Sequence, residues 1–426
     1  MLSQRRSRWI FRPALYHEAR VSQAQGRPGA MLDSRPFAGR SPPMRILHVF
    51  KTYLPDTHGG IEQVIRQMCG ATRTLGLSNR ILTLSEQPSP EWIEVEGIPV
   101  QRVRQDANIA STGLSRAAFG AFARAARDSD VIHYHFPWPF MDVLQLAVRP
   151  GKPYVVSYHS DIVKQRHLLQ LYRPLQRHFL SRASRIIVAT EPYRRSSQEL
   201  RGLEANTKVI PYGLDEASYP APSQPCLAQW RQRLGPRFLL FVGVLRYYKG
   251  LHLLLDALAG LDLPLAIVGD GPERAALEAQ AHRLGLRNCH FLGRLPEEDV
   301  AALYSLAETF VFPSHLRSEA FGMALLEAAM YGKPLISCAI GSGMSEINRH
   351  EQTGLDVAPT SAAIREALLR LWQAPEERVR FGAAARAHFE QHFQAEQLGR
   401  RLATVYAQIA PDAASPGAAD DYRHPR

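Results

Sequence analysis

Two glutamates at a fixed spacing are the clearest candidates for chemistry in this chain. Glu319 and Glu327 lie in the stretch from Ser318 to Gly332, where the intervening residues are small or apolar and favour a helix. The apolar run Phe310 to Phe312 before them predicts a short buried strand. Helical rise would place the two carboxylates on the order of 10 Å apart, wider than paired hydrolytic carboxylates. That spacing suits the two ends of one extended ligand, whose anionic middle the helix start would bind. In the competing interpretation, Glu319 only caps the helix and Glu327 faces water.

Two adjacent glycines mark a second candidate binding loop. Gly59 and Gly60 lie between a predicted strand, Arg45–Phe50, and a predicted amphipathic helix, Ile61–Leu75. A strand, a glycine loop and a helix in this order are typical of phosphate-binding folds. The alternative is a tight turn that simply requires glycine. Because the loop is not GxGxxG, a tightly bound dinucleotide is not indicated.

Charged and titratable residues follow two other predicted strands. Arg246 and Lys249 come after the strand Phe238–Val242, and two cations at such a strand-to-helix turn fit a diphosphate. His159 comes directly after the strand Tyr154–Tyr158. The carboxyl ends of strands in open α/β sheets face the ligand crevice, so we expect His159 to lie there.

No metal or cofactor site is predicted. Asp128 and Asp130 form a DxD triplet, but it precedes its predicted strand instead of following one. There is no HExxH and no Cys/His cluster with ligand spacing. The four cysteines are scattered and are typical of reduced cytosolic thiols.

The composition is that of a soluble protein with anionic ligands. Hydrophobic residues make up 45% and charged residues 21%, and no apolar run reaches the length of a membrane span. The net charge is +11, of which residues 1–43 contribute +6 through eight arginines and two acids. The mildly basic remainder fits anionic substrates or an anionic membrane surface better than nucleic acid.

Alternating strands and helices on both sides of a proline-rich segment predict two doubly wound α/β domains facing a cleft. Chain length also favours two domains. The expected divisions are a disordered basic extension or mis-assigned start (1–43), a first α/β domain (44–218), a linker (219–235), a second α/β domain (236–390), a helix that could cross back to the first domain (391–411) and a disordered tail (412–426).

One predicted helix, His167–Arg185, has an apolar side and an arginine-rich side. It is interpreted as a packing helix with solvated arginines, or as a helix resting on an anionic membrane. The expected location is the cytoplasm, with peripheral contact to the inner face of the membrane as a further hypothesis.

The order of the motifs resembles a known family. Gly59-Gly60, YHSD (158–161), VGVLRYYKG (242–250), GDGPE (269–273), FLGRL (291–295) and the two glutamates eight residues apart are similar to the retaining GT-B glycosyltransferases of family 4, over residues 44–410. The residues of YHSD and GVLRYYKGLH resemble the subgroup that moves mannose or rhamnose from a GDP-sugar in bacterial O-antigen and polysaccharide assembly. The fold implied is two Rossmann-like domains, with the first (44–218) on the acceptor side and the second (236–390) binding the nucleotide sugar.

The resemblance implies roles for individual residues. His159 would contact the donor sugar, Lys249 the phosphates and Glu319 the transferred sugar, and these three are the catalytic candidates. Glu327 would hold the ribose hydroxyls, and the turn at 292–294 would border the base. Implied donor-binding residues are Gly59, Gly60, Arg246, Lys249, Gly293, Arg294, Phe321, Gly322, Met323 and Glu327.

The implied reaction is metal-independent hexosyl transfer with retention, from a nucleotide sugar to a lipid-linked glycan. One residue departs from the family pattern: Val244 stands where arginine is common, and Arg246 could supply the missing cation. A UDP-sugar donor of the same fold and a nucleotide-sugar 2-epimerase are alternatives. A phosphorylase-like enzyme and a sugar-binding sensor are also considered. A phosphorylase would need a lysine that carries pyridoxal phosphate, and no lysine in the sequence is marked for that role. A sensor would not explain the cations that are placed to bind phosphate.

Overall fold

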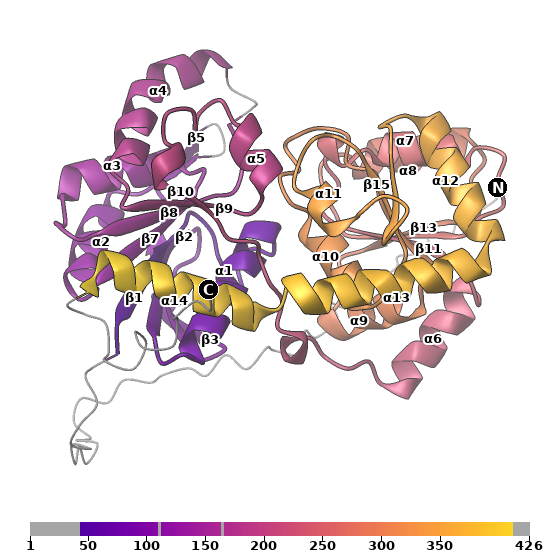
Figure 1. The fold of residues 1–426 in the computed structure, drawn as a ribbon, viewed down its shortest axis with the longest axis horizontal. Coiled ribbons are helices and arrows are strands. Elements are labelled where there is room, and N and C mark those ends of the chain that lie inside the picture. The colour runs from indigo at the N-terminus through magenta and orange to yellow at the C-terminus, as the bar shows by residue number, and fades with distance from the viewer. Residues whose placement is uncertain (1–42, 110–111, 163–165, 412–426) are drawn as a thin grey trace, which may run out of the picture.

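The structure is a computed structural model that describes residues 43–109, 112–162 and 166–411. Two sheets of mostly parallel strands form two layered halves joined by long connections (Figure 1). The predicted extension and tail lie outside the described residues, apart from Pro43. Two α/β halves are the predicted fold class, and it is confirmed.

The first sheet has eight strands in the order β10-β9-β8-β7-β1-β2-β4-β3, and only β3 runs antiparallel to its neighbour. Its strands are β1 Arg45–Val49, β2 Ser78–Ser85, β3 Trp92–Val95, β4 Ile98–Arg104, β7 Val131–Phe136, β8 Tyr154–Tyr158, β9 Arg185–Val188 and β10 Thr207–Val209; β5 Ala107–Ile109 and β6 Thr112–Leu114 form a separate hairpin. The accompanying helices are α1 Gly60–Arg73, α2 Ala117–Arg127, α3 Pro139–Val148, α4 Arg166–Ser181 and α5 Glu191–Ser196, with 3-10 turns η1 Glu204–Asn206 and η2 Glu216–Ser218.

The second sheet has six parallel strands in the order β13-β12-β11-β14-β15-β16. They are β11 Leu239–Val242, β12 Leu265–Val268, β13 Cys289–Gly293, β14 Thr309–Phe312, β15 Leu335–Cys338 and β16 Gly354–Val357. The helices are α6 Gln224–Leu234, α7 Leu251–Leu258, α8 Arg274–Arg283, α9 Glu297–Leu306, α10 Met323–Met330, α11 Met344–Ile347, α12 Ser361–Gln373, α13 Pro375–His392 and α14 Ala395–Ile409, with the 3-10 turn η3 Tyr247–Lys249.

The strand order places a ligand-binding edge in each half. In the first sheet the order reverses between β1 and β7, and in the second between β11 and β14. Parallel α/β sheets bind ligands at the carboxyl ends of the strands beside such a reversal. The segments after β1, β11 and β14 contain Gly59, Lys249 and Glu319, so the predicted site residues follow the strands at which a ligand is expected.

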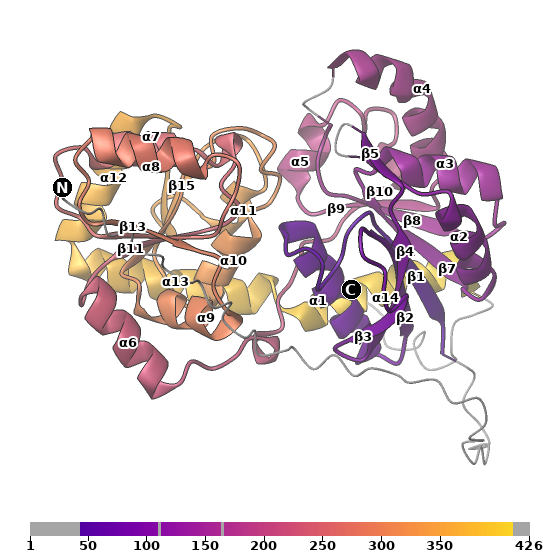
Figure 2. The same ribbon diagram turned by 180° about the vertical axis from the view of Figure 1, so that it is seen from behind.

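Two chain crossings connect the halves side by side. Leu214 accepts a hydrogen bond from the backbone N–H of Ala395 and donates one to Phe393. Beyond this crossing α14 packs on α1, and a Cβ on Gly399 would lie 2.7 Å from the carbonyl oxygen of Ala71. Both views show α13 along the second half and α14 along the first (Figures 1 and 2). The last helix therefore belongs to the core of the first half.

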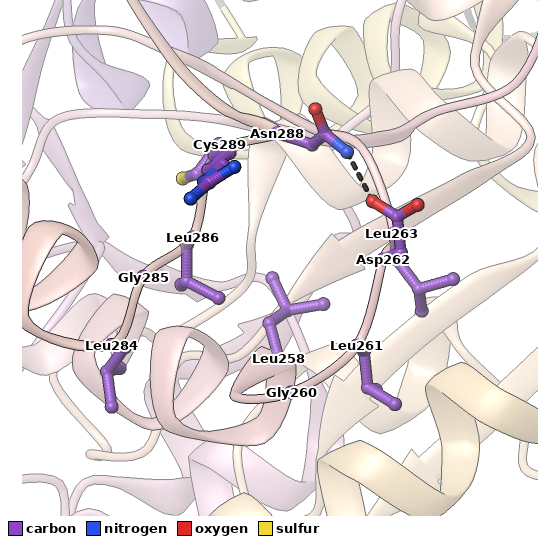
Figure 3. A pocket seen from close by; sticks show the side chains of 11 residues that line it. Leu258, Gly260, Leu261, Asp262, Leu263, Leu284, Gly285, Leu286, Asn288 and Cys289 are labelled. Carbon is purple, nitrogen blue, oxygen red and sulfur yellow. Dashed lines mark hydrogen bonds between the residues drawn. The ribbon is translucent and has the colours of Figure 1, made fainter.

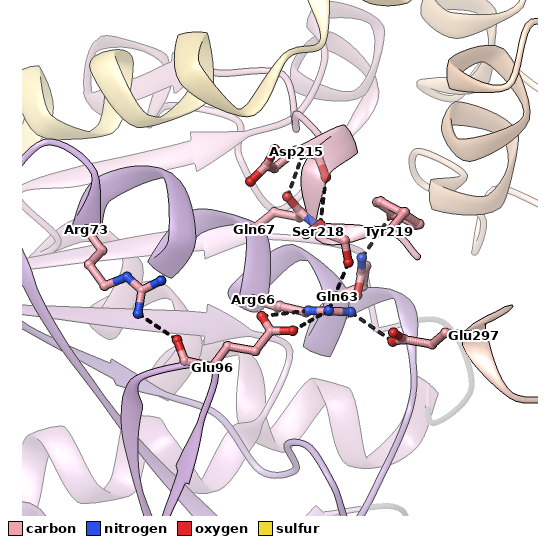
Figure 4. A network of polar contacts seen from close by, with 9 residues as sticks. All are labelled: Gln63, Arg66, Gln67, Arg73, Glu96, Asp215, Ser218, Tyr219 and Glu297. Atoms are coloured by element: carbon pink, nitrogen blue, oxygen red, sulfur yellow. Dashed lines mark hydrogen bonds and ion pairs between the residues drawn. The ribbon is translucent and has the colours of Figure 1, made fainter. Parts of the chain in front are cut away.

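A polar network ties α1 to the segment that leaves the first half and to α9 of the second (Figure 4). Arg66 on α1 pairs with Glu96 in its own half and with Glu297 on α9, whose carboxylate is 3.0 Å away. Gln67 donates to the Ser218 hydroxyl at 3.1 Å. The start of α1 is thus fixed relative to both halves.

Some elements differ from the sequence prediction. Strands β3 to β6 and helix α3 were not predicted. The expected linker, 219–235, contains α6, which starts at the Ser223 cap with Pro225 in its first turn and packs on α9 through a Trp230–Asp299 hydrogen bond of 2.7 Å. Prolines there open a helix instead of excluding one. Helix α10 begins at Met323, so Glu319 lies in the preceding loop and Glu327 in the second helical turn.

The arginine-rich helix α4 buries its apolar side where its side chains are described. Phe179 and Leu180 are each 1% exposed, whereas Arg173 and Arg177 face solvent. This favours the packing interpretation. Within the described ranges, no helix is both long enough and apolar enough to cross a bilayer.

Candidate active site

A buried ion pair joins the two central strands of the second sheet. Lys249 ends η3 after β11, and Glu319 lies in the loop after β14. The Lys249 Nζ is 2.5 Å from the Glu319 Oε2, which also accepts a hydrogen bond from the Ser314 hydroxyl at 3.2 Å. The ammonium lies 4.4 Å from the centroid of the Phe312 ring. A cation and a carboxylate are therefore held together, largely out of water, at the reversal point.

Gly250 makes this pairing possible. Its φ is +70°, and a Cβ there would lie 2.0 Å from the carbonyl oxygen of Pro313. Only glycine combines that left-handed backbone with so close an approach. The turn that carries Lys249 can consequently lie directly against the loop that carries Glu319.

The start of α10 lies beside the start of α1 from the other half. Gly322 caps α10 with φ +92°, and a Cβ there would be 3.1 Å from the Phe312 ring. A Cβ on Gly60 would be 3.9 Å from the Met323 side chain, and Gly59 caps α1 in extended conformation. The first N–H groups of a helix lack helical partners and carry partial positive charge. Two helix N-termini therefore converge where an anion is expected.

Glu327 is partly buried, and two tyrosines hold its carboxylate. Its carboxylate accepts hydrogen bonds from the Tyr219 hydroxyl at 3.0 Å and the Tyr304 hydroxyl at 2.9 Å. Gln63 on α1 donates to the same Tyr219 hydroxyl at 2.9 Å. Burial raises the pKa of Glu327, and the tyrosine hydrogen bonds oppose that shift. The carboxylate is connected to the first half through one hydroxyl.

His159 lies at the carboxyl edge of the first sheet with both ring nitrogens occupied. Its Nε2 is 3.0 Å from the His135 Nδ1, and its Nδ1 is 2.6 Å from the Tyr212 hydroxyl. Burial lowers the pKa of His159 to about 3, so the ring is neutral. The Tyr212 ring packs on Phe321, with centroids 4.8 Å apart, just before α10. The His159 ring thus reaches the second half through Tyr212.

The remaining predicted donor residues lie around this centre without joining the ion pair. Gly293 ends β13 with φ +73°, and Arg294 and Arg246 are exposed. One cation was missed: Lys51, which directly follows β1. Burial lowers the pKa of Lys51, the negative charge of Glu62 opposes this, and the positive charge of Arg246 adds to it. The two cations from opposite halves act on one another, and the signal was the position of Lys51 at a strand end.

The DxD triplet lies at the opposite edge of the first sheet. Asp130 precedes β7, and its carboxylate pairs with Arg45 at the start of β1, 2.9 Å away. Asp128 is 3.9 Å from Arg80. These aspartates are therefore engaged with neighbouring arginines and are remote from the strands' carboxyl ends.

A hollow in the second half also lies at the wrong edge for the donor (Figure 3). Its lining includes Leu258 at the end of α7, Leu286 in the loop before β13 and Cys289 at the start of β13. Asp262 and Asn288 are hydrogen-bonded across it. Burial raises the pKa of the Cys289 thiol to about 12, so this thiol is unreactive at neutral pH.

Three histidines come together in the structure, although the sequence has no Cys/His cluster with ligand spacing. His48, His133 and His135 each place a ring nitrogen within 4.8 Å of the others, all fully buried. Spacing along the chain does not indicate this group, because its members come from the neighbouring strands β1 and β7. Every one of their ring nitrogens already has a hydrogen-bond partner in the protein.

The arrangement in the second half can bind and stabilise a diphosphate. A buried ammonium and a helix N-terminus lower the energy of negative charge that grows on a leaving phosphate. The neighbouring carboxylate of Glu319 can accept hydrogen bonds from sugar hydroxyls, and Glu327 can do so from a ribose. These groups match transfer of a group from a nucleoside diphosphate.

Comparison with known proteins supports this chemistry. Residues 227–388 match the family model described as glycosyl transferases group 1, and residues 59–213 match the glycosyl transferase 4-like domain. The chain is 53% identical to the D-rhamnosyltransferase WbpZ of Pseudomonas aeruginosa, over 83% of this chain and 93% of that protein. It is 44% identical to the O-antigen chain mannosyltransferase C of Escherichia coli, over 86% and 99%.

Comparison with solved structures points to the same family of folds. A sucrose-phosphate synthase from Thermosynechococcus elongatus superposes with a TM-score of 0.72 at 22% identity, over 87% of this chain and all of that one. The chain belongs to the group 1 glycosyltransferases, with the family 4-like domain in its first half and the GT-B fold.

Proposed function

We propose that this glycosyltransferase moves D-rhamnose or mannose from a GDP-sugar to a lipid-linked O-antigen or related polysaccharide acceptor. The observation that carries the proposal is the high identity to a rhamnosyltransferase and an O-antigen mannosyltransferase over nearly their whole lengths. The buried Lys249–Glu319 pair at the strand-order reversal supports it from the structure.

In the proposed reaction, the bond from the anomeric carbon to the phosphate oxygen breaks through an oxocarbenium-like state. The acceptor hydroxyl forms the new bond from the same face, and configuration is retained. Its proton passes to the departing phosphate, so the products are the extended glycan and GDP. Lys249 and the first turn of α10 stabilise the charge that develops on the diphosphate.

The other residues bind and orient. Glu319 lies where it could receive hydroxyls of the transferred sugar while holding Lys249. Glu327 would receive the ribose hydroxyls, Gly59 and Gly60 would leave room for the diphosphate, and the Gly293 turn would border the base. The domain limits expected from the sequence, 44–218 and 236–390, are part of the same proposal.

The test is transfer itself. Purified protein is incubated with GDP-mannose, GDP-D-rhamnose or UDP-glucose and a lipid-linked O-antigen primer, and the lipid product is analysed by mass spectrometry. We expect one added hexose or deoxyhexose from a GDP donor and an α linkage in the product. Transfer only from a UDP-sugar, or conversion of the nucleotide sugar without any acceptor, would overturn the proposed donor or reaction.

Contact with the inner face of the membrane is a separate part of the proposal, consistent with a lipid-linked acceptor. The exposed Arg173, Arg177 and Arg182 at the end of α4 would provide it through charge, since the neighbouring apolar side chains are buried. In vesicle flotation at low salt, the protein should float with anionic vesicles and not with neutral ones. Recovery in the soluble fraction with both would contradict it.

A further inference from the structure

Four histidines of the first half gather on one face of the sheet. His48 on β1 is the register partner of His133 on β7, His135 is two residues further along the same strand, and His159 follows β8. His135 stacks on each of the other three rings, with centroids 5.3 Å apart for His48, 4.6 Å for His133 and 5.3 Å for His159. All four are buried, so every ring nitrogen needs a partner from the protein.

One end of this group fixes the direction of a hydrogen-bond chain. The side-chain amide of Asn79 lies 3.1 Å from the backbone carbonyl oxygen of Cys69. A carbonyl oxygen can only accept, so the Asn79 atom facing it is the Nδ2. The Asn79 Oδ1 must then face His48, whose Nε2 is 3.2 Å away. His48 is thereby required to carry its proton on Nε2.

The donor and acceptor of each following hydrogen bond are then fixed by the bond before it. A neutral imidazole has one N–H, so the His48 Nδ1 accepts from the His135 Nε2 at 3.0 Å. By the same reasoning the His135 Nδ1 accepts from the His159 Nε2 at 3.0 Å. The His159 Nδ1 is left to accept from the Tyr212 hydroxyl at 2.6 Å. All three rings are Nε2–H tautomers.

The surroundings keep the chain neutral. Burial lowers the pKa of His48 to about 4 and that of His159 to about 3, and it also lowers the pKa of His135 well below its ordinary value. Beside the chain lie the neutral His133 ring, bonded to the hydroxyls of Ser157 and Tyr406, and the Tyr212 hydroxyl. None of these groups supplies the negative charge that would favour an imidazolium.

We propose that Asn79, His48 and His135 are positioning residues for His159: through three hydrogen bonds they hold its ring in the Nε2–H tautomer, with Nδ1 accepting from Tyr212. The inference rests on the proposed function together with the role that the family resemblance implies for His159, contact with the donor sugar. The hydrogen-bond chain also connects the two halves. Tyr212 packs on Phe321, just before α10, so the hydrogen-bond chain joins the interior of the first half to the proposed phosphate site of the second.

The direct test is the tautomeric state. Full-length protein labelled with ¹⁵N-histidine gives long-range ¹⁵N–¹H spectra that distinguish the two neutral tautomers and the imidazolium. His48, His135 and His159 should show the neutral Nε2–H pattern from about pH 6 to about pH 8. An Nδ1–H pattern, protonation in this range, or one tightly bound zinc per chain held by these rings would overturn the inference.

The functional test uses a matched pair of substitutions on β7. His135→Phe interrupts the chain, whereas His133→Phe removes an equally buried, stacked ring that bonds only to Ser157 and Tyr406. We expect kcat to fall more than about tenfold in the first variant and by less than about threefold in the second, with little change in the donor KM in either. Equal losses in both would show a merely structural role.

A second pair acts at the far end of the chain. Asn79→Leu removes the acceptor for His48, and Thr72→Val removes a neighbouring hydroxyl while leaving the bond from Asn79 to Cys69. Only Asn79→Leu should give mixed tautomers at His159 and a lower kcat. An unchanged His159 spectrum in this variant would contradict the inference. Because the spectra need no turnover, failure of the proposed donor would leave this result standing and distinguishable.

Discussion

The two halves of the molecule differ in the side chains that they place toward the carboxyl ends of their strands. In the first, His159 at the carboxyl edge ends a neutral hydrogen-bond chain of imidazoles whose pKa values are lowered by burial, and the cation Lys51 lies at the same edge. In the second, the corresponding edge holds a buried ammonium–carboxylate pair and a second carboxylate, Glu327, bonded to two tyrosines. Both halves use the same α/β layout, so the difference comes from their side chains. The histidine chain of the first half can orient a group, whereas the Lys249–Glu319 pair of the second can act through charge.

The largest effect should come from removing the charge at the second edge. Lys249→Ala should lower kcat by at least about 10²-fold, since in the proposed reaction this cation stabilises the leaving diphosphate. It also leaves Glu319 buried without its partner, which should cost about 3–5 kcal/mol of folding free energy.

The variant pair Lys249→Met and Lys249→Met/Glu319→Gln separates these two effects. The double variant should recover most of the melting temperature of the wild type without recovering activity. Restored activity in the double variant would show that Lys249 acts on stability alone.

A smaller effect is expected at the charged edge from Glu327→Gln. The donor KM should rise about tenfold with kcat nearly unchanged, since the charge-assisted hydrogen bond proposed between Glu327 and the ribose would become a neutral one. Donors with a 2′-deoxyribose provide the control. They should bind more weakly than normal donors to the wild type, and the difference should shrink in the variant. A KM that does not change would remove Glu327 from the donor site.

Acid should destabilise the folded protein through the buried histidines of the first half. Below their ordinary pKa of 6.5 the histidines of the unfolded chain bind protons, whereas folded His48 and His159 stay neutral down to about 4 and about 3. The stability they contribute is present above about pH 6.5 and is lost as pH falls through that window. Glu327, with its raised pKa, works in the opposite direction but is a single group.

Denaturant unfolding from pH 7 to pH 4.5 measures this slope. His135→Phe should reduce it by up to about one proton relative to the wild type. Equal slopes in the variant and the wild type would show that the chain is not neutral in the folded state.

The smallest effect is expected at the amino-terminal edge of the first sheet, which is remote from the Lys249–Glu319 pair and from His159. Asp128→Ala should change kcat by less than about twofold, because Asp128 lies at the amino-terminal edge of the first sheet beside Arg80. Activity assayed with EDTA and with added Mn²⁺ is the measurement. Loss of turnover that Mn²⁺ rescues would instead assign the DxD triplet to catalysis.

Local patterns in the sequence were enough to predict much of the fold. The strand Tyr154–Tyr158 was predicted to the residue, and the helix predicted at Ile61–Leu75 lies within two residues of α1 at each end, because the apolar patterns of both are strong. Strands β3 and β4 were missed since their charged residues obscure the alternation. Helix α6 was missed because its opening prolines were interpreted as a linker.

The sequence predicted residues of the candidate site but not the contacts between them. Lys249 and Glu319 were each named, but their pairing depends on Gly250 lying against Pro313, which no local pattern reveals. The residues His133 and His135 on one strand do indicate a shared face, a signal that was available and not used. Their partners, Asn79 and Tyr212, come from distant segments, so the chain of hydrogen bonds needed the structure.

The central claim, that the charged edge of the second half binds the diphosphate of a GDP-sugar, is tested most directly by ligand-induced thermal shift. Wild type and Lys249→Met/Glu319→Gln are each melted in EDTA with GDP, GDP-mannose, UDP and UDP-glucose. A ligand at 100 times its Kd should stabilise the wild type by about 2.7 kcal/mol. We predict this shift with the GDP compounds in the wild type and its loss in the double variant. An equal shift in both proteins, or a shift with UDP compounds alone, would contradict the claim.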